Sequence, residues 1–212
     1  MPLTVLTVGH STRTSEDFIQ LLQVHGVTRV VDVRAIPRSR HNPQFDQELL
    51  SRSLKEAGIR YTHMAGLGGL RHTTRNSLNL GWRNESFRGF ADYMQTSNFE
   101  RSLKEMLRSA RKERIALMCS EAVPWACHRS LIADALVARG IRTRHIMSPS
   151  HDEPHTLTSF AKVRGLHITY PGEIKFRKQP QTPNKRNAMT MRNGIGRVVA
   201  RGGGKTRSTK RT

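Results

Sequence analysis

Short apolar segments rich in β-branched residues alternate with helix-length segments between residues 3 and 150, and no other feature of the chain restricts its fold as strongly. The predicted strands cover residues 3–10, 27–34, 59–64, 114–121 and 141–146. The segments that join them are long enough for right-handed crossovers, which place successive strands parallel in one sheet. We therefore predict a single α/β domain of Rossmann-like, three-layer type, with a mostly parallel sheet covered by helices on both faces.

Helical periodicity and capping residues locate the elements between the strands. The predicted helices cover residues 15–26, 47–58 and 127–140, and one or two further helices are expected within 86–113. Ser15 is the expected N-cap of the first helix, and Gly26 is its expected terminator. Residues 65–85 are rich in Gly and Asn and have no clear period, so we expect a long functional loop there.

Charge and composition set the C-terminal segment apart. The chain of 212 residues has a formal net charge of +20, and residues 174–212 hold 12 basic residues and no acidic ones. Few apolar groups there can offset the cost of ordering the backbone. We predict an α/β domain over 1–150, a peripheral segment over 151–173 that packs on it, and a basic, disordered tail over 174–212. The tail is expected to bind nucleic acid through counterion release, or else to act only as a solubilising arm.

The sequence also argues against several classes of protein. No segment approaches the ~18 apolar residues that a membrane-spanning helix needs, and the N-terminus lacks the pattern of a signal peptide, so we predict no membrane partner and a cytoplasmic location. Two cysteines do not make a disulfide framework and are expected to be free thiols. The GLGG segment 66–69 does not meet the dinucleotide fingerprint, and we predict no cofactor. The sequence leaves the oligomeric state open.

Polar residues gather where the predicted strands end. In an open parallel sheet, ligands bind at the carboxyl ends of the strands, and arginines outnumber acidic residues there. Guanidinium groups and helix N-terminal amides suit a phosphate or carboxylate, so an anionic small molecule is the expected ligand. The expected anion- or substrate-binding residues are Ser11, Asp32, Arg34, Arg38, Ser39, Gly68, Gly69 and Arg129. Any one of these arginines could instead be a structural partner of Asp32 or Glu121.

The segment LMCSEAVPWACHRSLIADAL, residues 117–136, contains both cysteines and most of the candidates for catalysis. Cys127 is expected at or next to a helix N-terminus, where a thiol pKa falls from ~8.5 toward neutrality and the thiolate can act as a nucleophile. The alternative is a small residue that packs at the start of a buried helix, and Cys119 is expected in the core. Glu121 is expected to be partly buried and to act as general acid or base, or else to cap the next helix. The expected catalytic residues are His10, Glu121, Cys127 and His128.

Metal binding by the cysteines and nearby histidines is an alternative interpretation of the same residues. The candidate ligands are Cys119, Cys127, His128, His10 and His63. Cys-x7-Cys-His is not a recognised zinc spacing, so we predict no metal. Thiol phosphatases and sulfurtransferases place an arginine six residues after the reactive cysteine. That arrangement is absent here, because positions 125 and 133 are Trp and Ala.

Four segments together resemble the bacterial and archaeal family named domain of unknown function 488. The matching stretches are TVGHSTRTSEDFIQLL (7–22), VVDVRAIPRSRHNPQF (30–45), YTHMAGLGGLR (61–71) and LMCSEAVPWACHRSLIADAL (117–136), within a resemblance that covers about residues 3–150. It implies an α/β domain of parallel-sheet type and carries no established reaction. The family's motif positions correspond to His10, Ser11, Asp32, Arg34, Pro37, Ser39, Gly68, Gly69, Cys119, Glu121, Cys127, His128 and Arg129. The basic tail lies outside the resemblance.

Three functional hypotheses follow from these residues. The first is an enzyme that binds an anionic, nucleotide or nucleic-acid-derived substrate at the strand ends and whose reaction the sequence does not specify. The second is a non-catalytic nucleic-acid-binding module that uses the same arginines and the basic tail, with binding that falls steeply with salt. The third is an interaction protein whose polar residues at the strand ends are structural and enclose no pocket.

Overall fold

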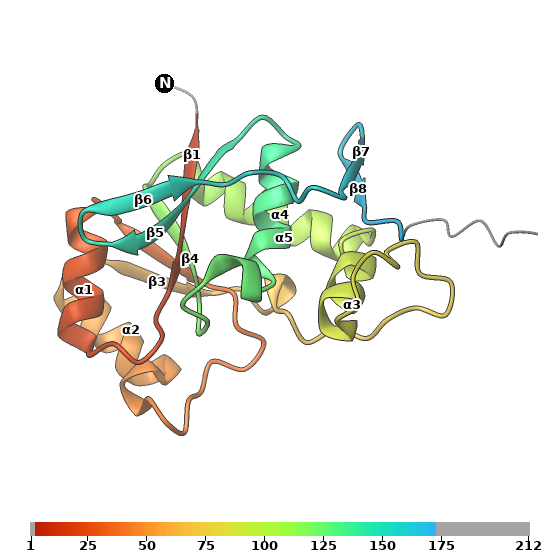
Figure 1. Cartoon of the computed structure of the whole chain (residues 1–212). Helices are drawn as coiled ribbons and strands as arrows, with labels where there is room; N and C mark the ends of the chain where they lie inside the picture. The colour runs from red at the N-terminus through yellow and green to blue at the C-terminus, as the bar shows by residue number, and fades with distance from the viewer. Residues whose placement is uncertain (1–2, 173–212) are drawn as a thin grey trace, which may run out of the picture. The chain divides into compact units, whose positions relative to one another are not determined.

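The computed structural model describes residues 3–172, which belong to one unit of the chain, Met1–Ile174 (Figure 1). Its six-stranded sheet has the order β3-β2-β4-β1-β5-β6. The strands are β1 (Thr4–Gly9), β2 (Arg29–Asp32), β3 (Arg60–His63), β4 (Ile115–Cys119), β5 (Arg142–Ser148) and β6 (His151–Pro154). All pairings are parallel except that of β5 with β6. The predicted α/β class and mostly parallel sheet are therefore confirmed, and β6 is a strand that the sequence did not indicate.

Five helices occupy the segments between the strands, close to the predicted boundaries. They are α1 (Ser15–Val24), α2 (Gln47–Glu56), α3 (Glu85–Tyr93), α4 (Ser97–Ala110) and α5 (Arg129–Val137). The prediction that Ser15 caps the first helix is wrong, because Thr14 is the N-cap and its Oγ1 accepts a hydrogen bond from the amide of Asp17. Gly26 follows α1 with a φ of +64°, the left-handed conformation that a glycine adopts without strain.

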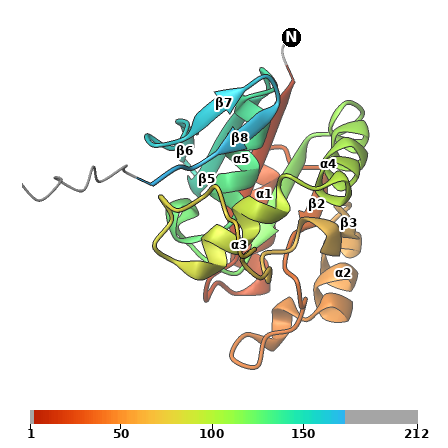
Figure 2. The same cartoon turned by 90° about the vertical axis from the view of Figure 1, so that its right-hand side faces the viewer.

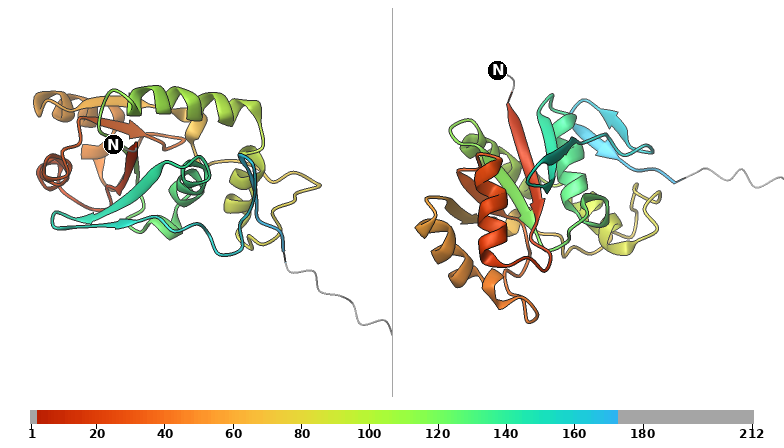
Figure 3. Two further views of the ribbon diagram at one scale, coloured as in Figure 1. Left: turned by 90° about the horizontal axis from the view of Figure 1, so that it is seen from above. Right: turned by 60° about the vertical axis from the view of Figure 1, so that its left-hand side comes forward.

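Apolar residues alternate along the central strands, and successive side chains enter opposite faces of the sheet. On one face, Leu6 and Val8 of β1 join a buried cluster with the apolar sides of α1 and α2. On the other face, Val5 joins a second cluster with residues of α3, α4 and α5. Both faces of the sheet are therefore covered, and Figures 2 and 3 show the helices on the two sides of the strands.

The residues after β6 and the long loop before α3 pack against the second cluster. A short hairpin of β7 (Lys162–Arg164) and β8 (His167–Thr169) leads to Tyr170, which is fully buried. The loop predicted over residues 65–85 contains one short turn of 3-10 helix, η2 (Ala65–Leu67), and has no other regular element before α3 begins at Glu85. The carboxylate of Asp92 on α3 holds this loop by accepting hydrogen bonds from Thr74, Ser77 and Asn79.

The strand order creates a crevice between β1 and β4. The chain leaves β1 through α1 toward β2, which lies beyond β4, and leaves β4 through α5 toward β5, which lies beyond β1. Because α1 and α5 pack on opposite faces, the two connections diverge from neighbouring strand ends. Such a switch point is where open α/β sheets bind ligands.

Two predictions concern parts of the chain beyond this sheet. The basic tail predicted over residues 174–212 lies outside the described residues. Within residues 3–172, no helix is long and apolar enough to cross a membrane.

Candidate active site

A cavity of about 570 Å³ opens at the carboxyl ends of the parallel strands, beside the crevice between β1 and β4. Eight of the twelve predicted site residues line it. They are His10, Arg34, Arg38, Ser39, Gly69, Glu121, Cys127 and His128. The other residues that line it include Ile36, Arg40, His41, Leu70, Phe87, Cys119 and Ser120.

The close approach of two backbone segments forms the floor of the cavity. The amide of His10 donates to the carbonyl of Cys119, and the amide of Ser11 donates to that of Ser120. A Cβ atom on Gly9 would lie 1.8 Å from the carbonyl oxygen of Glu121, so only glycine allows this contact. Ser11 has a φ of +52° and forms the turn itself, and its side chain does not line the cavity.

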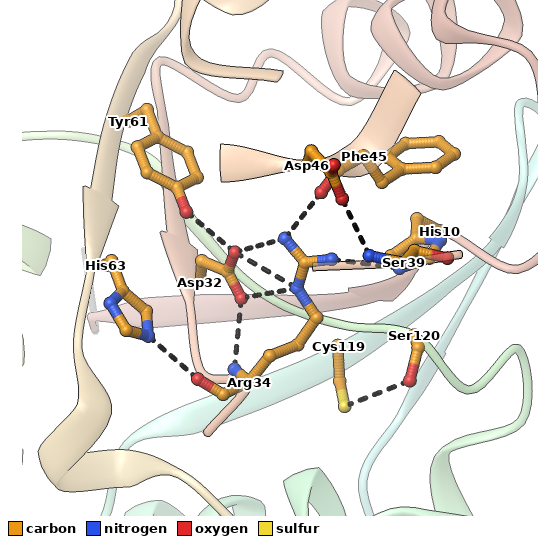
Figure 4. A network of polar contacts seen from close by, with 10 residues as sticks. All are labelled: His10, Asp32, Arg34, Ser39, Phe45, Asp46, Tyr61, His63, Cys119 and Ser120. Carbon is orange, nitrogen blue, oxygen red and sulfur yellow. Dashed lines mark hydrogen bonds and ion pairs between the residues drawn. The ribbon is translucent and has the colours of Figure 1, made fainter. Parts of the chain in front are cut away.

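A buried ion pair at the end of β2 holds one wall (Figure 4). The Asp32 carboxylate is fully buried and accepts from Nη2 of Arg34 at 2.6 Å and from its Nε at 2.9 Å. Tyr61 also donates to Asp32, at 2.7 Å. Burial disfavours the charged guanidinium, but the hydrogen bonds and charge of Asp32 outweigh this effect and raise the pKa of Arg34. Arg34 is thereby fixed in its charged form, with Asp32 behind it and outside the cavity lining.

His10 lies beside this ion pair and is held in its neutral form. Its Nδ1 donates to the carbonyl of Ser11 at 2.8 Å, which leaves Nε2 as an acceptor 3.5 Å from Nη1 of Arg34. The ring also stacks on Phe45 with the centroids 4.0 Å apart. Burial, assisted by the charge of Arg34, lowers the pKa of His10 to about 4. The lone pair on Nε2 is therefore present at neutral pH.

The opposite wall carries the two thiols and one imidazole. Nε2 of His128 lies 3.0 Å from the carbonyl oxygen of Val33 and 3.1 Å from that of Leu67. Because a carbonyl only accepts, Nε2 carries the ring hydrogen and Nδ1 has the lone pair. Nδ1 lies 3.7 Å from Sγ of Cys127, and the ligand atoms of Cys119, Cys127 and His128 all lie within 4.8 Å of one another.

The pKa values of the two neighbouring thiols are shifted in opposite directions, because donation from the Cys119 S–H favours a thiolate on Cys127. Donation from Cys119 lowers the pKa of Cys127 to about 6, and the charge and backbone amide of Arg129 act in the same direction against burial. The amide of Arg129 lies 3.5 Å from the Cys127 sulfur, next to the N-terminus of α5. The same hydrogen bond, together with burial, raises the pKa of Cys119 to about 12. At neutral pH the pair is thus one thiolate, on Cys127, and one thiol, on Cys119.

Arg129 lies under the cavity and does not line it. Its side chain is 1% exposed, with Nη1 donating to Oγ1 of Thr7 and Nη2 donating to the carbonyl of Glu121 at 2.5 Å. Within residues 3–172 its Nε has no hydrogen-bond partner, and its side chain is among the groups that lower the pKa of Cys127. The backbone amide of Arg129 therefore contacts the Cys127 sulfur, and its guanidinium contacts the backbone at the floor of the cavity.

A chain of buried hydrogen bonds continues from Arg129 away from the cavity. Oγ1 of Thr7 lies 2.7 Å from Nδ1 of His145, whose Nε2 lies 2.9 Å from Nδ1 of His155. His155 in turn contacts Asp134 at 2.8 Å. Burial, with a contribution from His155, lowers the pKa of His145 to about 3. The chain of contacts thus runs from the buried guanidinium of Arg129 to the buried carboxylate of Asp134 through the imidazoles of His145 and His155.

Two exposed arginines and an exposed histidine occupy the outer rim, on the loop after β2. Arg38, Arg40 and His41 are exposed and line the cavity. In the part of the chain that the structure describes, neither arginine pairs with a carboxylate. The loop is held because Asp46 accepts from the amide of Ser39 and Ser39 accepts from the amide of Asn42.

Two glycines bring the segment after β3 against the cavity. A Cβ on Gly69 would lie 2.5 Å from Nδ1 of His128, so this glycine leaves room for the imidazole. Gly68 packs on the backbone of Ala35, where a Cβ would be 2.9 Å from its Cα, and does not line the cavity. Glu121 is exposed on the rim, so the expectation that it is partly buried is wrong.

Among residues 3–172, Cys119, Cys127 and His128 are the group of His, Cys, Asp or Glu residues whose spacing would suit a metal ion. His10 and His63, the other candidate ligands, belong to different contacts: Nε2 of His63 bonds to the carbonyl of Arg34. A tetrahedral zinc site needs a fourth ligand, which water would have to supply from the cavity. The structure therefore allows a three-ligand site but holds all three atoms in hydrogen bonds of their own.

The contact between the cysteines is the feature of the site that the sequence analysis missed. Cys119 is in the core, as predicted, but it also lines the cavity and touches Cys127. The sequence did contain a signal for this proximity, because the two cysteines lie at the two ends of one strand-to-helix connection. One ends the strand β4, and the other immediately precedes His128, the N-cap of α5.

Comparison with known proteins gives one match. Residues 14–136 match a family model described as "Domain of unknown function DUF488". The matched span contains Arg34, both cysteines and His128, whereas His10 lies before it. No curated protein and no solved structure matches the chain.

Proposed function

We propose that this chain, which belongs to the family described as Domain of unknown function DUF488, is an enzyme that holds an anionic substrate at the strand ends and attacks it with the Cys127 thiolate. The observation that carries the proposal is the arrangement around this sulfur. A backbone amide at a helix start and the Nδ1 lone pair of His128 both face it, and it lines an open cavity.

Cys127 and His128 are positioned as a nucleophile and its base. His128 is fixed by two backbone carbonyls, so its Nδ1 can take the thiol proton from Cys127 and return it to a leaving group. Arg129 and the start of α5 stabilise the negative sulfur from below. A cysteine that served only as packing would not need a fixed imidazole and a buried cation next to it.

The rim supports an anionic substrate. Arg38, Arg40 and His41 line the cavity, and among residues 3–172 neither arginine pairs with a carboxylate. Arg34 adds a fixed positive charge. Apolar side chains such as Phe87 lie on the same lining. A volume of about 570 Å³ is within the usual range for small-molecule sites. A nucleotide or a nucleic-acid-derived fragment has this combination of phosphate and apolar base.

Glu121 is proposed for proton transfer with the substrate, and His10 is proposed as a positioning residue. Glu121 is exposed at the rim and its carboxylate can accept a proton in the cavity. His10 keeps its Nε2 lone pair toward Arg34 and orients that side chain. Replacing Glu121 by Gln should abolish turnover without affecting the fold, and unchanged turnover of a substrate would remove Glu121 from the mechanism.

A Rossmann-like, three-layer organisation is part of the proposal. The divergence of α1 and α5 from neighbouring strands supports it, since this is how such folds open a ligand site at the strand ends. We also propose a reducing, cytoplasmic setting, which two free cysteines near one another favour.

Alkylation of Cys127 by a charged and a neutral reagent tests this function. Iodoacetate and iodoacetamide differ mainly in charge, so their rate ratio on the protein, divided by the ratio on a free cysteine derivative, measures attraction of an anion. We expect this normalised ratio to be roughly ten at low salt and to fall toward one in about 0.5 M salt, where a Debye length of about 4 Å screens the exposed charges.

Matched variants assign the effect. A variant with Arg38→Gln and Arg40→Gln should lose most of the preference for iodoacetate but keep the iodoacetamide rate, whereas Cys127→Ser should lose the labelled site. If iodoacetate reacts no faster than iodoacetamide after normalisation, the cavity does not attract anions. If Cys127 reacts like a free thiol at every pH, it is not the activated nucleophile.

A specific observation also favours the alternative of a nucleic-acid-binding module. Twelve of the 36 basic residues lie in residues 174–212, with no acidic residue among them. This alternative requires binding to DNA or RNA that falls steeply with salt and is unchanged in Cys127→Ser and Glu121→Gln. If a chain ending at residue 173 binds as tightly as the full chain, the tail makes no contribution.

A further inference from the structure

We infer that Cys119 and Cys127 form a dithiol couple that reduces small anionic disulfides, with Cys127 as the attacking sulfur and Cys119 as the resolving sulfur. The inference rests on the proposed function, because it takes Cys127 as the nucleophile and the rim arginines as the anion-binding groups. It adds to the proposed function a reaction, the reduction of a disulfide, and a substrate class, small anionic disulfides.

The geometry places both sulfurs where such a reaction needs them. The Sγ atoms of Cys119 and Cys127 lie within 4.8 Å of each other, and both residues line the same cavity. One sulfur ends β4, and the other precedes the N-cap of α5, so the connection of residues 120–126 joins them. To bond, the sulfurs must close to about 2 Å, which side-chain rotation and a shift of this connection would provide.

A donor next to Cys127 lowers its pKa, but nucleophilic catalysis by Cys127 alone does not require that donor to be a second thiol that lines the cavity. His128 already supplies the base, and Arg129 with the helix start already stabilises the thiolate. Cys119 nevertheless lines the cavity with its Sγ within 4.8 Å of the Cys127 sulfur, and its thiol has the higher pKa of the two. This division is what thiol–disulfide exchange requires, because one sulfur must attack as the thiolate while the other keeps its proton until the second step.

The proposed exchange has two balanced steps. In the first, the Cys127 thiolate attacks one sulfur of a disulfide R–S–S–R, so that a Cys127–S–S–R bond forms, the S–S bond of the substrate breaks and R–S⁻ leaves. In the second, Cys119 gives its proton to Nδ1 of His128 and attacks the Cys127 sulfur, which expels the second R–S⁻. That thiolate takes the proton back from His128. The substrate gains two electrons, the cysteines become a disulfide, and a low-molecular-mass thiol reductant restores them.

Burial and charge restrict the substrate. Cys127 is 3% exposed and Cys119 is 6% exposed, at the inner end of a cavity of about 570 Å³. A disulfide held in a folded protein is too large to reach them, whereas a small one can enter. Arg38 and Arg40 line the route and carry no carboxylate partner among residues 3–172, which favours a disulfide with carboxylate groups.

The aromatic dicarboxylate disulfide DTNB is both a probe and a substrate of this class. The chain has two cysteines in all, so every thiolate released from the reagent reports on this pair. We expect the reduced, native full-length protein to release two equivalents of the aromatic thiolate and to retain no adduct in the intact mass. Peptide mapping should then show a disulfide between Cys119 and Cys127. A dithiol such as dithiothreitol should restore the pair and sustain turnover.

Single variants separate the two steps. Cys119→Ser keeps a hydrogen-bond donor but cannot resolve, so it should release one equivalent and retain one adduct on the remaining thiol. Cys127→Ser should react at least tenfold more slowly than the wild type. A neutral disulfide, 2,2′-dithiodipyridine, should give the same stoichiometry with a smaller rate advantage over a free thiol.

Several results would overturn the inference while sparing the proposed function. If the wild type releases one equivalent and keeps one adduct, Cys119 does not resolve. Two equivalents with two retained adducts would mean that both thiols react independently. A stoichiometric metal ion in the purified protein, retained until the thiols are modified, would make the pair metal ligands. In the first two cases, fast alkylation of Cys127 with a preference for iodoacetate would still support the nucleophile and the anion site.

Discussion

Removing the Cys119 thiol by Cys119→Ala should make Cys127 a weaker acid and therefore a slower nucleophile near pH 6. Donation from Cys119 is the largest of the effects that lower the pKa of Cys127 to about 6. The variant loses this donor but keeps the amide of Arg129 and Nδ1 of His128 next to the sulfur. The pKa of Cys127 should therefore rise without returning to that of a free thiol.

The size of the change follows from the strength of one charge-assisted hydrogen bond. Such a bond contributes about 1.5–3 kcal/mol, and one pKa unit corresponds to about 1.4 kcal/mol, so the midpoint should rise by about one to two units. At pH 6 the thiolate fraction would fall from about one half to between roughly one tenth and one hundredth. Alkylation at that pH should then slow by about 5- to 50-fold, while the rate at pH 9 changes little.

The assay is the rate of iodoacetamide labelling of Cys127 from about pH 4.5 to about pH 9.5, a range that extends roughly 1.5 units below the lowered pKa and about one unit above the ordinary thiol pKa. Rates are followed by intact mass and normalised to the plateau at high pH. Cys119→Ser is the matched control, because its hydroxyl can still donate, and its midpoint should lie closer to that of the wild type. If the wild type and Cys119→Ala share one midpoint, the two sulfurs do not share a hydrogen bond and the reasoning fails.

Three further predictions concern the groups that support this site. Asp32→Asn leaves the Arg34 guanidinium buried without its carboxylate, so the free energy of unfolding in urea titrations should fall by about 3–5 kcal/mol. A loss under about 1 kcal/mol, which is typical of a surface ion pair, would contradict the buried ion pair. Gly69→Ala should slow labelling of Cys127 at pH 6 by at least about tenfold, because the new Cβ would meet Nδ1 of His128 at 2.5 Å; an unchanged rate would show that the imidazole is not needed. Burial lowers the pKa of His145 to about 3, so between about pH 3 and pH 6.5 the imidazole is protonated in the unfolded chain and neutral in the folded one. The contribution of His145 to stability is therefore complete above about pH 6.5, and the free energy of unfolding falls by up to about 1.4 kcal/mol for each unit of pH below it. His145→Gln should show a shallower loss of unfolding free energy between pH 6.5 and 4.5, compared with the same protein's value at pH 7, and an identical slope would contradict the buried neutral imidazole.

Much of the architecture was predictable because local patterns specify it. The apolar period in each strand and helix identified the elements, and Gly26 marked the end of α1 as expected. The polar residues after each strand were then certain to lie along one border of the sheet, because the carboxyl ends of parallel strands share that border. This reasoning placed His10, Arg34 and Glu121 together before any coordinates.

Other features depend on distances that no local pattern encodes. Arg129 has the sequence context of an anion ligand, yet the register of β1 and β4 puts the carbonyl of Glu121 and the hydroxyl of Thr7 within reach of its guanidinium, and it is buried. Glu121 shows the reverse case, since the turn after β4 directs it outward. The N-cap prediction at Ser15 failed for a similar reason, because Thr14 competes for the same role and the entry of the chain decides between them.

The sequence by itself determined the α/β class, the order of the elements, the border of the sheet where polar groups collect and the family to which the chain belongs. These follow from periodicity, turn residues and short motifs, all of which act over a few neighbouring residues. Only the tertiary structure decided that Cys119 touches Cys127, that His128 offers them Nδ1, and that Arg129 lies beneath the cavity while Arg38 lies at its rim. Contacts of this kind depend on strand register and on the direction of each side chain, and those are set when segments distant in sequence pack against one another.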